Sequence, residues 1–122
     1  MEFRIQLDFV FRYNICPAGW HFPSFAEFSI LSTTADGNAL KALGIGVGGG
    51  VGTNTSGFTA LLAGNSDVAG IFENLGLYVQ LWTPTSLSGT EATAMGLPTN
   101  QSSIAFGSVN KQAGFSVRCI RD

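Results

Sequence analysis

The order of the predicted elements is the feature that most limits the fold of this chain. Residues 3–13 alternate apolar with mostly polar side chains, which predicts an amphipathic first strand within residues 1–12. Helical spacing follows in residues 24–34, and after it come only short strand-like segments separated by turns. Because strands and helices do not alternate as in β-α-β units, this order predicts an α+β fold with a mostly antiparallel sheet.

The helical segment carries its own start signal. Ser24 and Glu27 form a capping box, in which each side chain satisfies a backbone N–H at the helix start. Phe25, Phe28 and Leu31 then recur at helical spacing. Asp36 or Asn38 would cap a second, shorter helix, so we expect one or two short helices packed on a small, loop-rich sheet.

Later segments predict strands and one loop. The predicted strands are residues 58–62, 78–83, 103–106 and 115–120. Residues 44–52 (GIGVGGGVG) do not fit any packed element, so they predict a flexible Gly-rich loop. A length of 122 residues suits one domain, and we assign residues 1–122 to it.

Composition excludes several partners. Charged residues make up only 11% of the chain, against about a quarter in typical soluble domains. The net charge is −2 and the basic residues are scattered, so nucleic acid is not an expected partner. No stretch is long and apolar enough to insert into a membrane. The first residues are unlike a signal peptide, so we expect a chain that has lost its leader or a piece of a longer protein, with a cytosolic protein as the third alternative.

Motifs for catalysis and cofactors are weak. Gly44, Gly46 and Gly49 match a dinucleotide fingerprint as letters, but no strand precedes them and no helix follows. His21 is the only histidine, so a His-rich metal site is impossible and a catalytic role is not expected. Asp67 and Glu73 flank a glycine turn, where a calcium site, paired carboxylates and solvated turn acids are open, the last favoured. We expect no cofactor and no metal.

Six residues are candidates for ligand contact. Tyr78 and Trp82 would stack on sugar faces if exposed, with core packing the favoured alternative. Amides in predicted turns would suit a polar ligand, although turns favour amides for backbone reasons alone. These amides are Asn65, Asn100, Gln101 and Asn110.

Two cysteines, Cys16 and Cys119, lie at opposite ends of the chain. They are too far apart in sequence for a CxxC redox or zinc pair. A disulfide and two separate buried thiols are both open at this point.

Five segments together resemble the Fibrobacter succinogenes major paralogous domain, a family of extracytoplasmic bacterial domains. Residues 16–28 (CPAGWHFPSFAEF) are similar to its "CPxGWHxPxxxEW" opening, and the other four follow in the family's order. These are Leu40-Lys41, residues 53–61 (TNTSGFTAL), residues 81–85 (LWTPT) and residues 114–122 (GFSVRCIRD).

The resemblance implies a fold similar to the C-type-lectin-like and formylglycine-generating-enzyme-like group, with adjacent chain ends. It also favours a disulfide between Cys16 and Cys119 and a location outside the cell or at its surface. Glu27 is expected to pair with Arg118. The matched residues with structural roles are Trp20, Ser24, Glu27, Gly57, Phe58 and Arg118.

Three functions remain open. The leading hypothesis is a non-catalytic recognition or adhesion module of a bacterial surface protein, with a glycan as one ligand class. The first alternative is a structural module that docks another protein or forms a homo-oligomer. The second is a divergent enzyme of the formylglycine-generating group, which would need a free reactive thiol pair.

Overall fold

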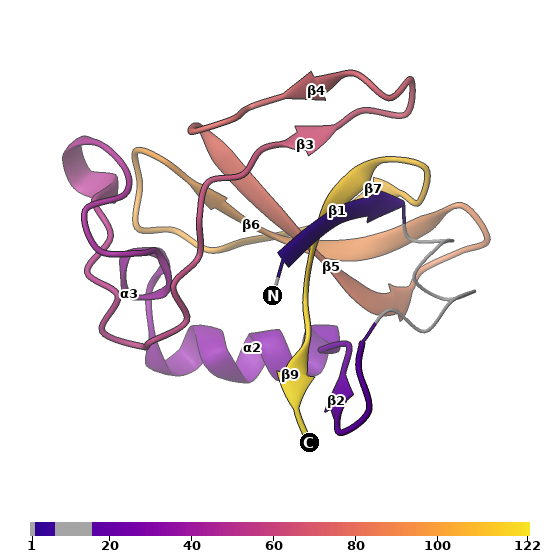
Figure 1. Cartoon of the computed structure of the whole chain (residues 1–122), viewed down its shortest axis with the longest axis horizontal. Coiled ribbons are helices and arrows are strands. Elements are labelled where there is room, and N and C mark those ends of the chain that lie inside the picture. Colours follow the sequence, from indigo (N-terminus) through magenta and orange to yellow (C-terminus); the bar gives the residue numbers. More distant parts are fainter. Residues whose placement is uncertain (1, 7–15) are drawn as a thin grey trace.

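The computed structural model describes residues 2–6 and 16–122, with the backbone alone for residues 2–6 and for Ser86. Strand β1 (Glu2–Gln6) falls within the predicted first strand, while residues 7–12 of that prediction lie outside the described residues. Two helices lie against a mostly antiparallel sheet, as Figure 1 shows. The α+β fold expected from the order of the elements is therefore confirmed.

The main sheet has seven strands among the described residues. Its path runs β4 (Phe72–Glu73), β3 (Asn65–Ser66), β8 (Gly114–Arg118), β5 (Tyr78–Ser86), β6 (Glu91–Pro98) and β7 (Ala105–Asn110). Strand β1 pairs with β8. The β5–β8 contact is parallel and the other strand ladders are antiparallel.

Both faces of the sheet are packed. Helix α2 (Phe25–Thr34) covers one face, where Phe28 meets Val79, Leu81 and Met95. On the opposite face, a second hydrophobic cluster contains side chains of β5, β6 and β8 together with both cysteines. Alternation along the strands produces this division because successive side chains point to opposite faces.

The helix signals in the sequence are confirmed. Ser24 caps α2 and accepts a hydrogen bond from the backbone N–H of Glu27, while the Glu27 carboxylate accepts one from the N–H of Ser24. Asp36 caps the shorter helix α3 (Gly37–Leu40) through the N–H of Ala39. Both caps satisfy N–H groups that have no partner inside a helix.

The two ends of the domain are joined three times. Strand β1 pairs with β8 over its whole length. Strand β2 (Trp20–His21) pairs with β9 (Ile120–Arg121), and a disulfide links Cys16 to Cys119. The adjacency of the ends that the resemblance implied is therefore confirmed, and the disulfide replaces the alternative of two free thiols.

One predicted strand is absent, one is shifted and a central strand was missed. The strand predicted at residues 103–106 overlaps β7 only at Ala105 and Phe106. Residues 58–62 form no strand apart from a bridge between Ala60 and Lys41. Thr59 has a positive φ of 58°, which turns the chain away from the extended form. Strand β6 was not predicted, although it pairs with both β5 and β7 and is almost wholly buried.

The Gly-rich segment is more tightly packed than its composition suggested. It contains a 3-10 turn (Gly48–Gly50), and Val47 donates its N–H to the carbonyl of Thr99 at 2.8 Å. A Cβ on Gly50 would overlap that same carbonyl oxygen, and one on Gly52 would overlap the carbonyl oxygen of Ala42. The glycines here permit close backbone contact.

Buried Lys41 connects the Gly-rich segment to its neighbours. The side chain is fully buried, and its ammonium donates to the side chain of Asn38 at 3.2 Å and to the carbonyls of Gly50 at 2.6 Å and Gln101 at 2.9 Å. Burial lowers the pKa of Lys41. Its three donors are all used, so this lysine connects α3, the Gly-rich segment and the loop after β6 to one another.

Candidate functional site

An apolar groove of about 450 Å³ lies beside α2. Phe28, Ile30 and Leu31 of the helix form one side, and Phe58 and Ile120 contribute the rest of the apolar lining. Its volume lies in the range of about 300–1,000 Å³ that is typical of ligand pockets. The groove is therefore our candidate functional site.

Helix α2 is apolar on more than the side that faces the sheet. Phe28 is buried in the core and Leu31 packs against it, but Ile30 lies in the groove with 68% of its surface exposed. A helix with apolar residues on both sides is typical of one that is covered on both sides. The groove was not predicted from the sequence, although the apolar Ile30, beside Phe28 and Leu31 in the helix, could have indicated it.

A tight turn places Phe58 opposite the helix. The side-chain oxygen of Asn54 accepts the backbone N–H of Thr59 at 2.9 Å, and Asn54, Gly57 and Thr59 all have positive φ values. The turn directs the Phe58 ring toward Phe28, with ring centroids 6.4 Å apart. The structural roles that the resemblance assigned to Gly57 and Phe58 fit this geometry.

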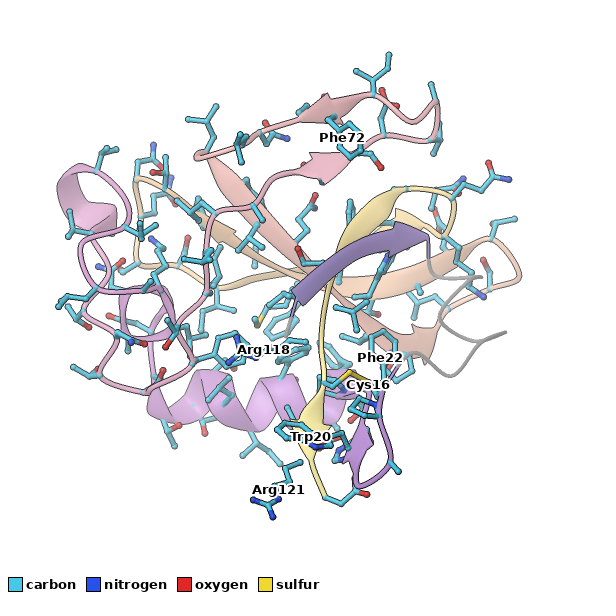
Figure 2. The ribbon with its side chains drawn as sticks, viewed as in Figure 1. Cys16, Trp20, Phe22, Phe72, Arg118 and Arg121 are labelled. Carbon is cyan, nitrogen blue, oxygen red and sulfur yellow. A yellow bond between two sulfur atoms is a disulfide. The ribbon has the colours of Figure 1, made fainter. Side chains whose placement is uncertain are left out.

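The Arg118 side chain stacks on Phe58. Its guanidinium carbon lies 4.5 Å above the centroid of the Phe58 ring, which is a cation–π arrangement. Figure 2 shows Arg118 between α2 and the sheet. The expected ion pair between Arg118 and Glu27 is not found among the described residues, where the Glu27 carboxylate pairs with His21.

His21 joins three parts of the chain at one end of the groove. Its Nε2 lies 2.8 Å from a carboxylate oxygen of Glu27 in α2, and its Nδ1 lies 2.6 Å from one of Asp122. Hydrogen bonding to Glu27, and then to Asp122, raises the pKa of His21, while the same contact lowers the pKa of Glu27. Since carboxylates occupy both ring nitrogens, this cluster is suited to holding segments together.

Three of the predicted ligand residues, Trp82, Asn65 and Tyr78, pack or hydrogen-bond within the domain. Trp82 is 0% exposed and stacks on Phe115 with ring centroids 4.5 Å apart, so it has no surface to offer a sugar. Asn65 is buried and hydrogen-bonds Glu73 and Asn74. Tyr78 is half-buried, and its ring lies over Gly96 of the neighbouring strand.

The other three are exposed but do not converge. Asn100 and Gln101 follow β6, beside the Gly-rich segment. Asn110 ends β7 opposite Glu91, at the other end of β6 from Tyr78. The structure thus does not bring the six predicted residues into one ligand surface.

The carboxylates of Asp67 and Glu73 accept hydrogen bonds from within the β3–β4 hairpin. Asp67 accepts hydrogen bonds from the N–H groups of Ala69 and Ile71, and Glu73 accepts one from Asn65. Among the described side chains, which belong to residues 16–122, no cluster of three metal-ligating groups occurs. Within residues 2–6 and 16–122, no helix is long and apolar enough to cross a bilayer.

Comparison with known proteins yields one match. A family model described as the Fibrobacter succinogenes major domain matches residues 8–121. No curated protein and no solved structure matches the chain.

Proposed function

This chain belongs to the Fibrobacter succinogenes major domain family, and from that premise we propose that it is a non-catalytic recognition module of an extracytoplasmic protein whose ligand is a protein segment with apolar side chains. The family match covers almost the whole chain but carries no activity with it. The ligand class therefore rests on the geometry of the groove.

The observation that carries the proposal is the chemistry of the groove beside α2. Five of its lining residues, Phe28, Ile30, Leu31, Phe58 and Ile120, are apolar. Burying such a surface against an apolar partner is favourable by about 25 cal/mol for each Å² of apolar area removed from water. An amphipathic segment lying in an apolar groove is a common mode of peptide recognition.

Two further features support the location and the absence of catalysis. The Cys16–Cys119 disulfide is typical of proteins in oxidising compartments outside the cytoplasm. The same bond uses both cysteines, whereas an enzyme of the formylglycine-generating group would need them free. His21, the only histidine, has a carboxylate at each ring nitrogen.

Selection from a displayed peptide library on the oxidised protein tests the ligand class. We expect binders that share large apolar residues at helical or alternate spacing. Ile30→Glu places a charge in the groove and should weaken binding about tenfold or more, which corresponds to at least about 1.4 kcal/mol.

Leu43→Glu is the matched control, because Leu43 is 77% exposed and does not line the groove. It should leave peptide binding unchanged. A library that gives no binder, or a binder that Ile30→Glu and Leu43→Glu weaken equally, would contradict the proposal.

One observation favours a glycan as a second candidate ligand. Trp20 is 45% exposed and lies opposite Arg121 in the β2–β9 pair, next to the His21 cluster. Figure 2 shows it at the surface near the C-terminus. An exposed indole beside polar groups suits a sugar face. A saturable signal on a glycan array that Trp20→Ala removes and Ile30→Glu leaves intact would establish this candidate instead.

A further inference from the structure

We propose that the outer edge of β7 binds an extended polypeptide strand of a partner protein, which lengthens the sheet by one strand. This site is separate from the groove beside α2, so it goes beyond the proposed function. Three observations support it: the direction of the backbone groups of β7, the side chains of this strand, and its difference from the strand at the other end of the sheet.

Strand β7 is the last strand at one end of the described sheet, where it pairs with β6 alone. Lys111 donates its N–H to the carbonyl of Thr90 at 2.8 Å, and this pair continues the β6–β7 register from Glu91 and Asn110. Hydrogen-bonded and non-bonded pairs alternate along an antiparallel ladder. The odd-numbered residues of β7 therefore bond β6, and its even-numbered residues face outward.

The register on the other side of β6 gives the same assignment. Thr99 donates its N–H to the carbonyl of Leu77 at 2.9 Å, which extends the β5–β6 register by one pair. Odd-numbered residues of β6 therefore face β5, and its even-numbered residues face β7. Ala94 of β6 lies opposite Gly107 of β7, as this assignment requires of a hydrogen-bonded pair.

The outward backbone groups of β7 are the N–H and C=O of Phe106 and Ser108 and the N–H of Asn110. No hydrogen-bond partner for any of them lies among residues 2–6 and 16–122. The carbonyl of Asn110 accepts the N–H of Ala113 at 3.0 Å, which ends the row. Donors and acceptors at this extended spacing match the backbone of another strand, and they define the chemistry of the partner.

The side chains of β7 leave this edge open. Its six residues (AFGSVN) include no charged residue and no proline, which commonly protect an exposed edge. Gly107 is exposed, and a Cβ there would meet nothing within 4 Å. Glycine inside a strand is typical of a place where another backbone approaches closely.

The strand at the other end of the sheet path is protected against strand addition. Strand β4 has only two residues, one of which is Glu73, and Asp67 lies in the turn before it. Short edge strands and charged side chains both prevent pairing with another chain. Of the two ends of this path, β7 is therefore the one that can accept a strand.

The face of β7 that carries Phe106 favours apolar side chains in the partner. The Phe106 ring packs edge-on against Phe25 with centroids 5.0 Å apart, and Phe25 is 37% exposed. Every second side chain of an added strand would lie on this face, beside the two rings. On the other face β7 presents Ala105, Gly107 and Val109, which leave room for larger side chains of the partner.

A displayed library of six-residue peptides built from Val, Ile, Thr and Ser tests the site. The target is the oxidised full chain with Ile30→Glu, which disables the groove. The strongest binder is then synthesised with N-methyl groups on alternate backbone amides, in two forms. One form should lose at least tenfold in affinity and the other should bind nearly as the parent peptide does, because only alternate amides of an added strand face β7.

Ser108→Pro tests the same edge from the side of the protein. Proline removes one outward N–H and no bond to β6, and the preceding Gly107 is already in a strand, as proline favours. Ser108→Ala is the matched control, since both variants lose the hydroxyl that donates to Glu91 at 2.9 Å. Affinity for the library peptide should fall at least tenfold in Ser108→Pro and stay unchanged in Ser108→Ala.

Amide hydrogen exchange measured by NMR needs no variant at β7. In the free chain, Gly107 and Val109 should exchange slowly, whereas Phe106 and Ser108 should exchange fast. Binding of the library peptide should slow exchange at Phe106 and Ser108 at least tenfold.

Three results would overturn the inference. The library could give no binder, a folded Ser108→Pro could bind as well as Ser108→Ala, or the bound peptide could leave Phe106 and Ser108 unprotected. A chain that binds no peptide but forms a dimer that Ser108→Pro abolishes would assign the edge to a second copy and reject the partner strand. Peptides selected on the groove should bind Ser108→Pro as they bind the parent chain, so the proposed function stands or fails separately.

Discussion

His21 shows how one side chain can fasten distant parts of the chain. It lies in β2, and its two ring nitrogens reach Glu27 in α2 and Asp122 at the C-terminal end. Glu27 in turn accepts the backbone N–H of Ser24, so the helix cap and the histidine contact share one carboxylate. The sequence predicted the cap from local spacing, but the contact with Asp122 spans 101 positions and has no local signal.

We predict that His21 titrates above its ordinary pKa of about 6.5, because both carboxylates favour the imidazolium. A raised folded-state pKa means that its stabilising contribution is complete below about pH 6.5 and is lost as the pH rises through the folded-state value. An NMR titration of this single histidine measures the midpoint directly.

Glu27→Gln is the informative variant for that titration. Glutamine can still accept the Ser24 N–H and keep the capping box, but it removes the charge that faces His21. The midpoint should fall in Glu27→Gln. A parent midpoint at or below 6.5 would show that the two contacts do not hold in solution.

At the level of single residues, the sequence predicted roles better when the cause was local. Ser24 was predicted as a cap, and Asp36 was one of two candidates beside Asn38, because capping depends on neighbours in sequence. Trp82 was a candidate for sugar contact with core packing the favoured alternative, and packing against Phe115 of β8 decided between them. A strand pattern gives the side of the sheet on which a residue lies, but not what covers that side.

At the scale of elements, the Gly-rich segment and strand β6 depart most from expectation. Strand β6 contains Ala92, Ala94 and Gly96, which have weak strand propensity and hid it from a pattern search. It is central because small side chains suit a strand buried on both faces, and the Tyr78 ring occupies the space above Gly96. The burial of β6 on both faces and the packing of Tyr78 over Gly96 depend on neighbouring strands, so neither can be predicted from the β6 sequence alone.

We predict that Gly50→Ala lowers the free energy of unfolding by about 1–3 kcal/mol, as overpacking does. The new Cβ would overlap backbone atoms of residues 99–101, which cannot move aside as a flexible side chain would. Gly107→Ala is the control, because a Cβ there meets nothing within 4 Å and the backbone has no positive φ. Urea unfolding of both variants tests this, and equal stabilities would mean that the segment is loosely held.

At the scale of the whole molecule, the disulfide and the β1–β8 ladder define the domain. The cysteines are 103 positions apart in sequence, and they join the segment before β2 to the segment after β8. The family resemblance supplied this pairing, whereas composition left it open. The order of the elements predicted the α+β class, since that class follows from sequence order alone.

Reduction should destabilise the domain by up to about 4–5 kcal/mol, the chain-entropy value for a loop of about 100 residues. The chain has two cysteines and they form this bond, so a reductant acts on it alone. Urea unfolding with and without reductant measures the difference. An unchanged midpoint would indicate that the reduced chain is already confined by other contacts.

The same bond sets how the domain would respond to a mechanical load. Tension applied to the polypeptide before Cys16 and after Cys119 passes across the sulfur atoms, so the residues between them are shielded from stretching. Strands β1 and β9 lie outside that covalent loop, so under such tension β1 would separate from β8 and β9 from β2, while the strands between the two cysteines stayed in place. In an oxidising environment the domain is therefore a nearly inextensible link with one short, reversible extension at each end.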